Sequence, residues 1–239
     1  MRSTRPEPAI ADASVFSALF DDLTDDDRAL PALIDGTSGA VMTYGELVGR
    51  AEAFAGALAA MGVRPGDVVG LHCPNVPAFA IAFHGILRAG ATATTVNALY
   101  TAGEIEKQLG ASKAVAHVTV SPLAPQSLAA ARAVGIGDDR IVVLDGLDGH
   151  PSLAELLAAG HAAPDVTIDP ATHVAVMPYS SGTTGNPKGV MLSHRNLVAN
   201  VAQCEPIIRV ERGERVLAVL PFFHIYGMTV LLNLALRAR

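Results

Sequence analysis

Short apolar runs alternate with amphipathic segments along most of the chain. The apolar runs predict strands at residues 32–35, 40–42, 67–73, 91–96, 114–118, 141–144, 173–177 and 215–220. The amphipathic segments predict helices at residues 13–23, 43–61, 75–88, 101–109, 123–134, 153–159, 193–207 and 227–236. Strands and helices that alternate at this spacing are typical of mostly parallel sheets with helices on both faces. The pattern therefore predicts an α/β fold, preceded by a loose lead-in at residues 1–12.

Local signals mark several of the predicted helix starts. Thr43 with Glu46, and Thr101 with Glu104, have the spacing of a capping box, in which each side chain bonds the backbone amide of the other residue. The acidic run at residues 25–27 follows the first helix and is predicted to be a solvated turn. These signals set boundaries and do not by themselves indicate a function.

One segment departs from the alternating pattern. Directly after the strand predicted at residues 173–177 comes a run of small and hydroxyl-bearing residues that ends in a lysine. The residues that matter are Ser180, Ser181, Gly182, Thr183, Thr184, Gly185 and Lys188. Such a loop presents backbone N–H groups, hydroxyls and one ammonium to a polyanion, and a nucleoside triphosphate is the simplest ligand with that surface. Lys188 is one of only three lysines among 17 basic residues, so its position in the loop is not background.

The loop does not match the common phosphate-binding motifs. Pro187 precedes the lysine, and Gly189 stands where a P-loop carries the Ser or Thr that holds Mg²⁺. The spacing of a dinucleotide-binding G-x-G-x-x-G loop is absent from the sequence as well. A plain surface loop and a kinase-like phosphotransferase, which would release ADP, are the alternatives that the residues leave open.

The overall composition excludes several classes of protein. Half of the 239 residues are hydrophobic and the mean hydropathy is +0.36, which indicates a folded core. A net charge of −6 argues against general nucleic-acid binding. The N-terminus leads to no signal-type apolar core, and the longest apolar stretch, at residues 76–87, is too short to span a bilayer. We expect a cytoplasmic protein without a transmembrane segment, in which Cys73 and Cys204 stay reduced.

Two motifs together resemble a known family. The segment Tyr179-Ser-Ser-Gly-Thr-Thr-Gly-Asn-Pro-Lys-Gly-Val-Met-Leu-Ser-His194 is similar to the AMP-binding signature of the adenylate-forming superfamily, which includes acyl-CoA synthetases, peptide-synthetase adenylation domains and luciferases. The segment Leu220-Pro-Phe-Phe-His-Ile-Tyr-Gly227 resembles a second motif of that family, in the form found in 4-coumarate–CoA ligase-like enzymes and their fatty-acyl relatives. Shorter likenesses, such as Cys73-Pro-Asn75, extend the resemblance over nearly the whole chain.

The resemblance implies an activity and a set of co-substrates. Family members activate a carboxylic acid with Mg-ATP to an acyl-adenylate and pyrophosphate, then pass the acyl group to a thiol such as coenzyme A. It implies that the loop residues named above, Gly185 and Lys188 included, bind the ATP phosphates. Thr184 is also expected to help hold Mg²⁺. Lys188 and His224 are the residues expected to take part in catalysis, since preorganised donors stabilise the charge that develops on pyrophosphate.

The second motif is expected to form the acyl pocket. By resemblance His224 lies near the carboxylate of the acid, and Tyr226, Gly227 and Val230 line the pocket. Val230 makes that wall apolar, which leaves hydroxycinnamates, other aryl acids and fatty acids open as substrates. His194, inside the signature, is expected to cap or pack at the start of the following helix.

The resemblance also implies that the chain is incomplete. Family enzymes are about twice as long and carry an adenine-binding Tyr-Gly-x-Thr-Glu segment, a ribose-binding segment and a small C-terminal domain, which have no counterpart in the sequence. We expect residues 13–239 to form part of the large N-terminal domain, with a first segment at about 13–65 and a loop-bearing subdomain at 66–239. The alternatives are a medium- or long-chain fatty-acyl-CoA synthetase, a fatty-acyl-AMP ligase, and a non-catalytic nucleotide-binding or interaction fragment. Nothing in the sequence sets the oligomeric state.

Overall fold

The computed structural model describes residues 7–180 and 188–239. A six-stranded sheet runs through its centre, in the order β10-β7-β4-β3-β5-β6. The strands are β3 Val68–His72, β4 Thr92–Thr95, β5 Ala114–Thr119, β6 Ile141–Val143, β7 Val174–Val176 and β10 Leu192–Ser193. All neighbouring pairs are parallel except β10 and β7, which are antiparallel. The predicted mostly parallel α/β fold is confirmed.

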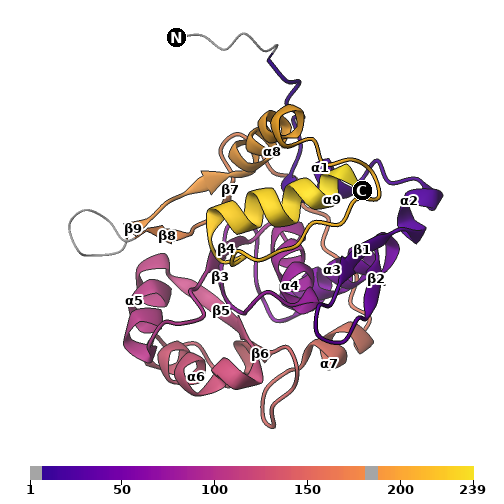
Figure 1. The fold of residues 1–239 in the computed structure, drawn as a ribbon. Helices are drawn as coiled ribbons and strands as arrows, with labels where there is room; N and C mark the ends of the chain where they lie inside the picture. Colours follow the sequence, from indigo (N-terminus) through magenta and orange to yellow (C-terminus); the bar gives the residue numbers. More distant parts are fainter. Residues whose placement is uncertain (1–6, 181–187) are drawn as a thin grey trace.

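Helices cover both faces of this sheet (Figure 1). Helices α3 (Tyr44–Ala60) and α4 (Pro77–Arg88) pack on one face, while α5 (Ala102–Ser112) and α6 (Ala124–Ala133) pack on the other. The remaining helices are α1 Val15–Phe20, α2 Asp25–Ala29, η1 Ser121–Leu123, η2 Asp138–Arg140, α7 Leu153–Ala158, α8 His194–Ile208, η3 Gly227–Leu234 and α9 Ala235–Ala238. Two short antiparallel hairpins complete the fold: β1 (Pro31–Ile34) with β2 (Val41–Thr43), and β8 (Tyr179–Ser180) with β9 (Lys188–Gly189).

Strand β3 shows why the sequence folds this way. It is buried along its whole length, as expected of a central parallel strand that is covered on both faces. Val69 and Leu71 belong to the main core cluster, together with side chains of α3 and α4. Gly70 points to the other face, where a Cβ atom would lie 2.5 Å from both Leu109 Cδ2 and His117 Nδ1. The glycine therefore allows α5 to pack directly on the sheet.

The helix starts follow their sequence signals. At the start of α3, the amide of Thr43 donates to Glu46 Oε2 over 2.8 Å, and the amide of Glu46 donates to Thr43 Oγ1 over 3.2 Å. The pair Thr101 and Glu104 forms the same capping box at α5. Gly62, with φ at +86°, ends α3 in the left-handed region that favours glycine. No helix in the described part of the chain is long and apolar enough to cross a membrane.

The acidic run at residues 25–27 is not a solvated turn, so that prediction is wrong. The run forms α2, which Thr24 caps, and Asp27 is only 6% exposed. Thr24 donates to the Asp27 carboxylate through its backbone amide and its hydroxyl, and with Arg212 these contacts lower the pKa of Asp27 to about 2. The helix start is set locally by the Thr24–Asp27 capping box, and the exposed Arg212 adds an ion pair from far along the chain.

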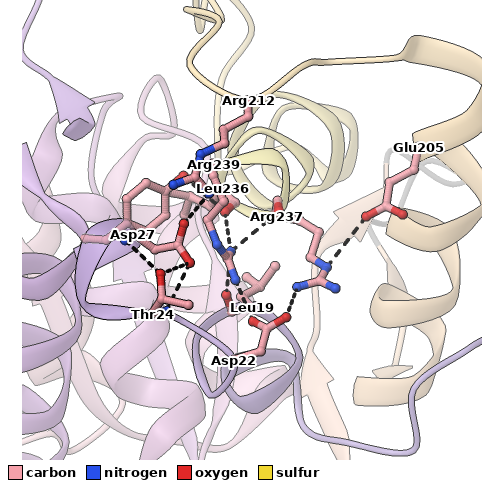
Figure 2. A network of polar contacts seen from close by, with 10 residues as sticks. Leu19, Asp22, Thr24, Asp27, Glu205, Arg212, Leu236, Arg237 and Arg239 are labelled. Atoms are coloured by element: carbon pink, nitrogen blue, oxygen red, sulfur yellow. Dashed lines mark hydrogen bonds and ion pairs between the residues drawn. The ribbon is translucent and has the colours of Figure 1, made fainter. Parts of the chain in front are cut away.

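The end of the chain packs against its beginning through further arginines. Figure 2 shows Arg237 between Asp22 and Glu205, at 2.8 Å and 3.6 Å respectively. Arg239 pairs with Asp22 at 2.5 Å and donates to the Leu19 carbonyl at 2.8 Å. Hydrogen bonds and charge from these two arginines lower the pKa of Asp22 against the opposing effect of its partial burial. Helix α9 is thus tied to α1, which lies more than 200 residues earlier in the sequence.

Residues 215–220 do not form the predicted strand. Their apolar side chains stand exposed, with Leu217 at 81% and Val219 at 71%. A strand needs a neighbouring backbone as partner, and here the side chain of Asn75 takes that place. Its amide nitrogen Nδ2 donates to the carbonyls of Ala218 and Leu220 over 3.0 Å and 2.9 Å. The predicted strand at residues 215–220 is therefore wrong, because no strand in the described part of the chain pairs with this segment.

The two expected segments of the chain, residues 13–65 and 66–239, share one core. Helix α3 from the first packs along α4 from the second, and side chains of both belong to a single hydrophobic cluster. Gly85 permits this contact, because a Cβ atom there would lie 2.9 Å from the Ala51 carbonyl oxygen. The division into segments stays a prediction about sequence organisation.

Candidate functional site

The glycine-rich loop leaves the central sheet and returns to it through a short hairpin. After β7 the chain forms β8, and after the loop it forms β9, with Ser180 opposite Lys188. This pairing brings the first and last of the expected phosphate-binding residues to the base of the loop. Five of the expected ligands, Ser181, Gly182, Thr183, Thr184 and Gly185, lie outside the described residues. Lys188 itself is exposed.

The aromatic ring of Tyr179 packs across this hairpin. A Cβ atom on Gly189 would lie 3.1 Å from the Tyr179 ring and 3.1 Å from Met177 Cγ. Only a residue without a side chain therefore lets the ring lie flat against β9. Burial raises the pKa of the Tyr179 phenol, so it stays protonated at neutral pH.

His224 lies at the edge of a hollow of about 230 Å³ next to this hairpin. The hollow is bounded by the carboxyl ends of β4 and β7, by the start of α5, and by the turn before η3. Its lining residues are Thr95, Asn97, Tyr100, Gln108, Pro178, Tyr179, Val190, Leu192, Phe223, His224 and Ile225. Ligands of parallel sheets bind where the strands end, and this hollow has that place in the fold. Tyr179 from the signature and His224 from the second motif therefore border one space.

The other residues expected in the acyl pocket are placed differently. Tyr226 is 51% exposed, and it does not line this hollow among the described residues. Gly227 is buried and closely packed. A Cβ atom there would lie 2.1 Å from the Pro221 carbonyl oxygen. Val230 packs with Val201 in a small cluster between η3 and α8. Of the four residues, the structure brings only His224 to the hollow.

The segment after β4 contributes side chains that the sequence reasoning missed. Asn97 and Tyr100 come from the connection between β4 and α5, and Gln108 comes from α5 itself. Gln108 Nε2 donates to Thr94 Oγ1 over 2.9 Å and to the Thr95 carbonyl over 3.0 Å. The signal was present in the sequence, since residues that follow a buried parallel strand lie at the ligand-binding edge of the sheet.

The histidine at the end of the signature has a structural position. His194 is buried at the first turn of α8, and its Nδ1 accepts a hydrogen bond from the Val15 amide over 3.0 Å. Burial and the neighbouring His173 lower the pKa of His194 to about 4. The ring is therefore neutral at physiological pH, which it must be to accept that bond. The expectation that His194 packs at the helix start is confirmed.

Other buried histidines lie away from the hollow. His72 Nδ1 lies 2.6 Å from Ser127 Oγ, and His117 Nε2 lies 3.2 Å from the same oxygen. Burial lowers the pKa of His117 to about 3 and also lowers the pKa of His72. This cluster lies between β3, β5 and α6, and no residue of it lines the hollow. It joins the sheet to α6 as neutral hydrogen-bonding groups.

Comparisons with known proteins agree with this arrangement. The family of AMP-binding enzymes matches residues 22–239. 4-Coumarate–CoA ligase 5 from Oryza sativa subsp. japonica is 40% identical, over 99% of this chain and 44% of its own. Its chain is thus more than twice the length that the present sequence spans.

Solved structures of similar proteins share the fold. A long-chain-fatty-acid–CoA ligase from Archaeoglobus fulgidus superposes with a TM-score of 0.88 and 26% identity, over 98% of this chain and 47% of that one. A benzoate–CoA ligase from Burkholderia xenovorans superposes with a TM-score of 0.82 and 27% identity, over 95% of this chain and 44% of that one. The signature loop, the second motif and the sheet edge that joins them lead to one conclusion: this chain belongs to the family of AMP-binding enzymes.

Proposed function

We propose that the protein is an ATP-dependent acid–CoA ligase, and that this chain supplies its phosphate loop and one wall of its acid site. The single observation that carries the proposal is that Tyr179 and His224, 45 residues apart, border the same hollow. The first belongs to the polyanion-binding loop and the second to a segment that presents a basic ring. A site that holds ATP phosphates next to a carboxylate is what acid activation requires.

The chemistry proceeds in two steps. The carboxylate of the acid attacks the α-phosphorus of ATP, the bond to the β-phosphate oxygen breaks, and pyrophosphate leaves. The resulting acyl-adenylate is then attacked by the thiol of coenzyme A, which gives acyl-CoA and AMP. Charge develops on the departing pyrophosphate, so the ammonium of Lys188 and the amides of the loop stabilise it most at that stage.

His224 is suited to orient the acid. It is exposed at the edge of the hollow, and its Nδ1 lies 3.4 Å from the Tyr226 amide, which leaves Nε2 free to carry the proton. An Nε2–H group donates to a carboxylate oxygen, and it holds the other oxygen toward the phosphate. The ring thus places the nucleophile and does not need to change its protonation state during adenylation.

Magnesium is expected to enter with ATP. Within the described residues there is no group of three or more histidine, cysteine, aspartate or glutamate side chains that could hold a metal ion. Mg²⁺ is commonly held by one or two protein groups together with substrate phosphates, and Thr184 remains the expected protein contact. When bound, the ion neutralises phosphate charge; the described residues contribute the loop base and the acid-facing wall.

An aryl acid of the coumarate type is the proposed substrate. The hollow carries Tyr100, Tyr179 and Phe223, whose flat faces suit an aromatic ring. The relative with 40% identity is a 4-coumarate–CoA ligase. Two solved structures with the same fold are ligases of a long-chain fatty acid and of benzoate. Fatty-acyl activation is the second candidate, since the long-chain-fatty-acid–CoA ligase from Archaeoglobus fulgidus superposes with a TM-score of 0.88.

Product analysis with an acid panel tests the proposal. The complete gene product is incubated with Mg-ATP, coenzyme A and a cinnamate, a benzoate or a fatty acid, and the products are separated by chromatography with mass detection. The proposal expects acyl-CoA and AMP in equal amounts, with the highest rate for a cinnamate. ADP in place of AMP would contradict it, and a highest rate with a fatty acid would favour the second candidate.

A further inference from the structure

The turn that carries His224 is held by two side chains that lie at or just after the ends of central strands. Asn75 follows β3, and Thr95 is the last residue of β4. Thr95 Oγ1 donates to the Phe223 carbonyl over 2.7 Å. Asn75 Oδ1 accepts from the Phe222 amide over 2.7 Å. The backbone groups directly before His224 are therefore bonded to residues about 130 to 150 positions earlier in the chain.

Asn75 also holds the segment that leads into the turn. Its Nδ2 donates to the carbonyls of Ala218 and Leu220, as described above for the extended segment. One amide side chain thus satisfies three backbone groups, in the way that a neighbouring strand would. Thr95 is only 3% exposed, so its bond lies where water competes little for the Phe223 carbonyl.

His224 has little else to define its place. Its own side chain is exposed, and its one recorded contact with described residues is the long one to the Tyr226 amide. Its backbone amide donates to the Pro221 carbonyl over 3.1 Å, within the same turn. The turn therefore sets the position of the imidazole. Asn75, Thr95 and the packing of Phe222 on Phe79 at 5.5 Å hold the turn from the sheet side, and the Met228 amide donates to the His224 carbonyl over 3.0 Å from η3.

We propose that Asn75 and Thr95 are positioning residues for His224 during acid adenylation. This inference rests on the proposed function. Both residues act through the backbone of residues 218–223. Thr95 also lines the hollow, so the tests below separate its bond to the turn from a direct contact with the acid. Since Thr95 is the end of a central strand, it transmits the rigidity of the sheet to the imidazole. A displacement of about 1 Å at such a group costs roughly 100-fold in rate.

Thr95 offers a matched set of variants. Thr95→Val removes the hydroxyl and keeps the shape, whereas Thr95→Ser keeps the hydroxyl. Thr92 lies on the same strand and donates to the Val174 carbonyl over 2.8 Å, so Thr92→Val removes an equivalent bond that does not reach the turn. We expect Thr95→Val to lower the adenylation kcat by about 10-fold to 100-fold. We expect Thr95→Ser to restore most of that loss, Thr92→Val to have less than about 3-fold effect, and the KM for ATP to change little in all three.

Asn75→Asp is the corresponding change at the second residue. The carboxylate still accepts from the Phe222 amide, but it cannot donate to the carbonyls of Ala218 and Leu220. The control is Asn200→Asp on α8, where an exposed asparagine lies away from the turn. We expect Asn75→Asp to slow adenylation and to raise the KM for the acid, because the imidazole moves relative to the carboxylate.

A double-mutant comparison in the complete gene product separates the inference from the proposed function. If His224→Ala adenylates at the wild-type rate, the role of His224 fails, and the inference fails with it. If His224→Ala is slow while Thr95→Val and Asn75→Asp are not, only the positioning role is overturned. Our account expects Thr95→Val to have almost no further effect once His224 is alanine. An equal loss in both backgrounds would mean that Thr95 acts through the fold, and would overturn the inference.

Hydrogen exchange gives a second readout in the 239-residue chain itself. Mass-spectrometric exchange is compared for a peptide spanning residues 218–226 and for a peptide from α3. We expect Thr95→Val and Asn75→Asp to speed exchange in the first peptide by at least about 10-fold and to leave the second unchanged, with Thr92→Val like wild type. Unchanged exchange at residues 218–226 would show that the two side chains do not hold the turn.

Discussion

The imidazole of His194 accepts a hydrogen bond from the backbone amide of Val15, 179 residues earlier in the chain. Val15 is the first residue of α1, and His194 is the first residue of α8. A residue of the signature therefore holds the N-terminal helix against the element that follows the glycine loop. One end of the signature, at His194, therefore serves packing, while the other end, at Tyr179, lines the hollow.

Loss of this bond is expected to destabilise the fold. His194→Leu keeps an apolar side chain but leaves the buried amide of Val15 without its acceptor, which costs about 1–3 kcal/mol. Urea unfolding of the 239-residue chain at pH 7.5 measures the difference in free energy of unfolding. His161→Leu, at an exposed position, is the control and is expected to be neutral within about 0.5 kcal/mol. Equal stability of the two variants would contradict the structural role of His194.

The chain is predicted to lose stability in mild acid, because several of its histidines are buried in the neutral form. The pKa values of His84 and His117 are lowered by burial to about 3, and that of His194 to about 4. In the unfolded chain these histidines titrate near the ordinary value of about 6.5. Between about pH 6.5 and pH 4 the unfolded chain therefore binds more protons than the folded one, and the free energy of unfolding falls as the pH falls.

Part of the fall in the free energy of unfolding with pH can be assigned to His84. Each such histidine contributes at most about 1.4 kcal/mol per pH unit in this window. His84 is fully buried between Phe20 and Phe83, and neither ring nitrogen has a hydrogen-bond partner among the described residues. Urea unfolding at several pH values should show a shallower slope for His84→Leu than for the wild type. An unchanged slope would mean that His84 is already protonated in the folded chain at mild acidity, or is not buried.

The sequence predicted some features of the fold better than others, and the reason is distance along the chain. Capping boxes such as Thr43 with Glu46 involve neighbours only, so they were correct. The ion pair of Asp27 depends on Arg212, and the state of residues 215–220 depends on Asn75. Neither partner is visible from a local pattern. Extended apolar sequence shows that a segment can be a strand, but not whether another strand is available to it.

The same distinction applies to the candidate site. The two motifs pointed to one place at the edge of the sheet, and Tyr179 and His224 do border one hollow there. Only the signature follows a strand, because residues 215–220 form none. Tyr226 and Val230 were expected to face the acid with His224. Tyr226 is exposed just before η3, and Val230 packs toward α8 from η3. Because η3 is a π-helix, its side chains do not repeat at the usual helical spacing. A helical pattern in the sequence does not reveal that change of spacing.

Replacing Asn233 by leucine is predicted to make the chain more stable. Its side chain is fully buried in η3, and neither amide atom has a hydrogen-bond partner among the described residues. It borders a small apolar cavity of about 100 Å³ between α1 and α8. Asn233→Leu removes the unpaired polar group and is expected to raise the free energy of unfolding by about 1–2 kcal/mol. Asn200→Leu on the exposed face of α8 is the control. A loss of stability at Asn233→Leu would show that the amide makes a bond that the surroundings described above do not provide.

Lys188 is expected to act on ATP and not on the acid. Lys188→Ala removes the ammonium at the base of the loop, and a hydrogen bond to a charged group contributes about 1.5–3 kcal/mol. This corresponds to a rise of roughly 10-fold to 100-fold in the ATP requirement, with slower adenylation and a nearly unchanged KM for the acid. Steady-state kinetics of the complete gene product measure both constants. Lys107→Ala, an exposed lysine on α5, is the control. An unchanged KM for ATP together with an unchanged rate would remove Lys188 from the phosphate site.

The 239-residue chain alone is expected not to form acyl-CoA. It spans 44% of the length of the rice ligase, and the adenine, ribose and C-terminal motifs of the family have no counterpart in its sequence. Purified chain mixed with Mg-ATP, coenzyme A and the acid panel should therefore yield no detectable acyl-CoA. Turnover by the isolated chain would show that these segments are dispensable.

Acid-dependent exchange between pyrophosphate and ATP tests the central claim most directly. Labelled pyrophosphate enters ATP only if the acyl-adenylate forms reversibly. The complete gene product is predicted to show exchange that requires a carboxylic acid and that falls in Lys188→Ala and in His224→Ala. Exchange that proceeds equally without any acid, or that neither substitution slows, would contradict the account.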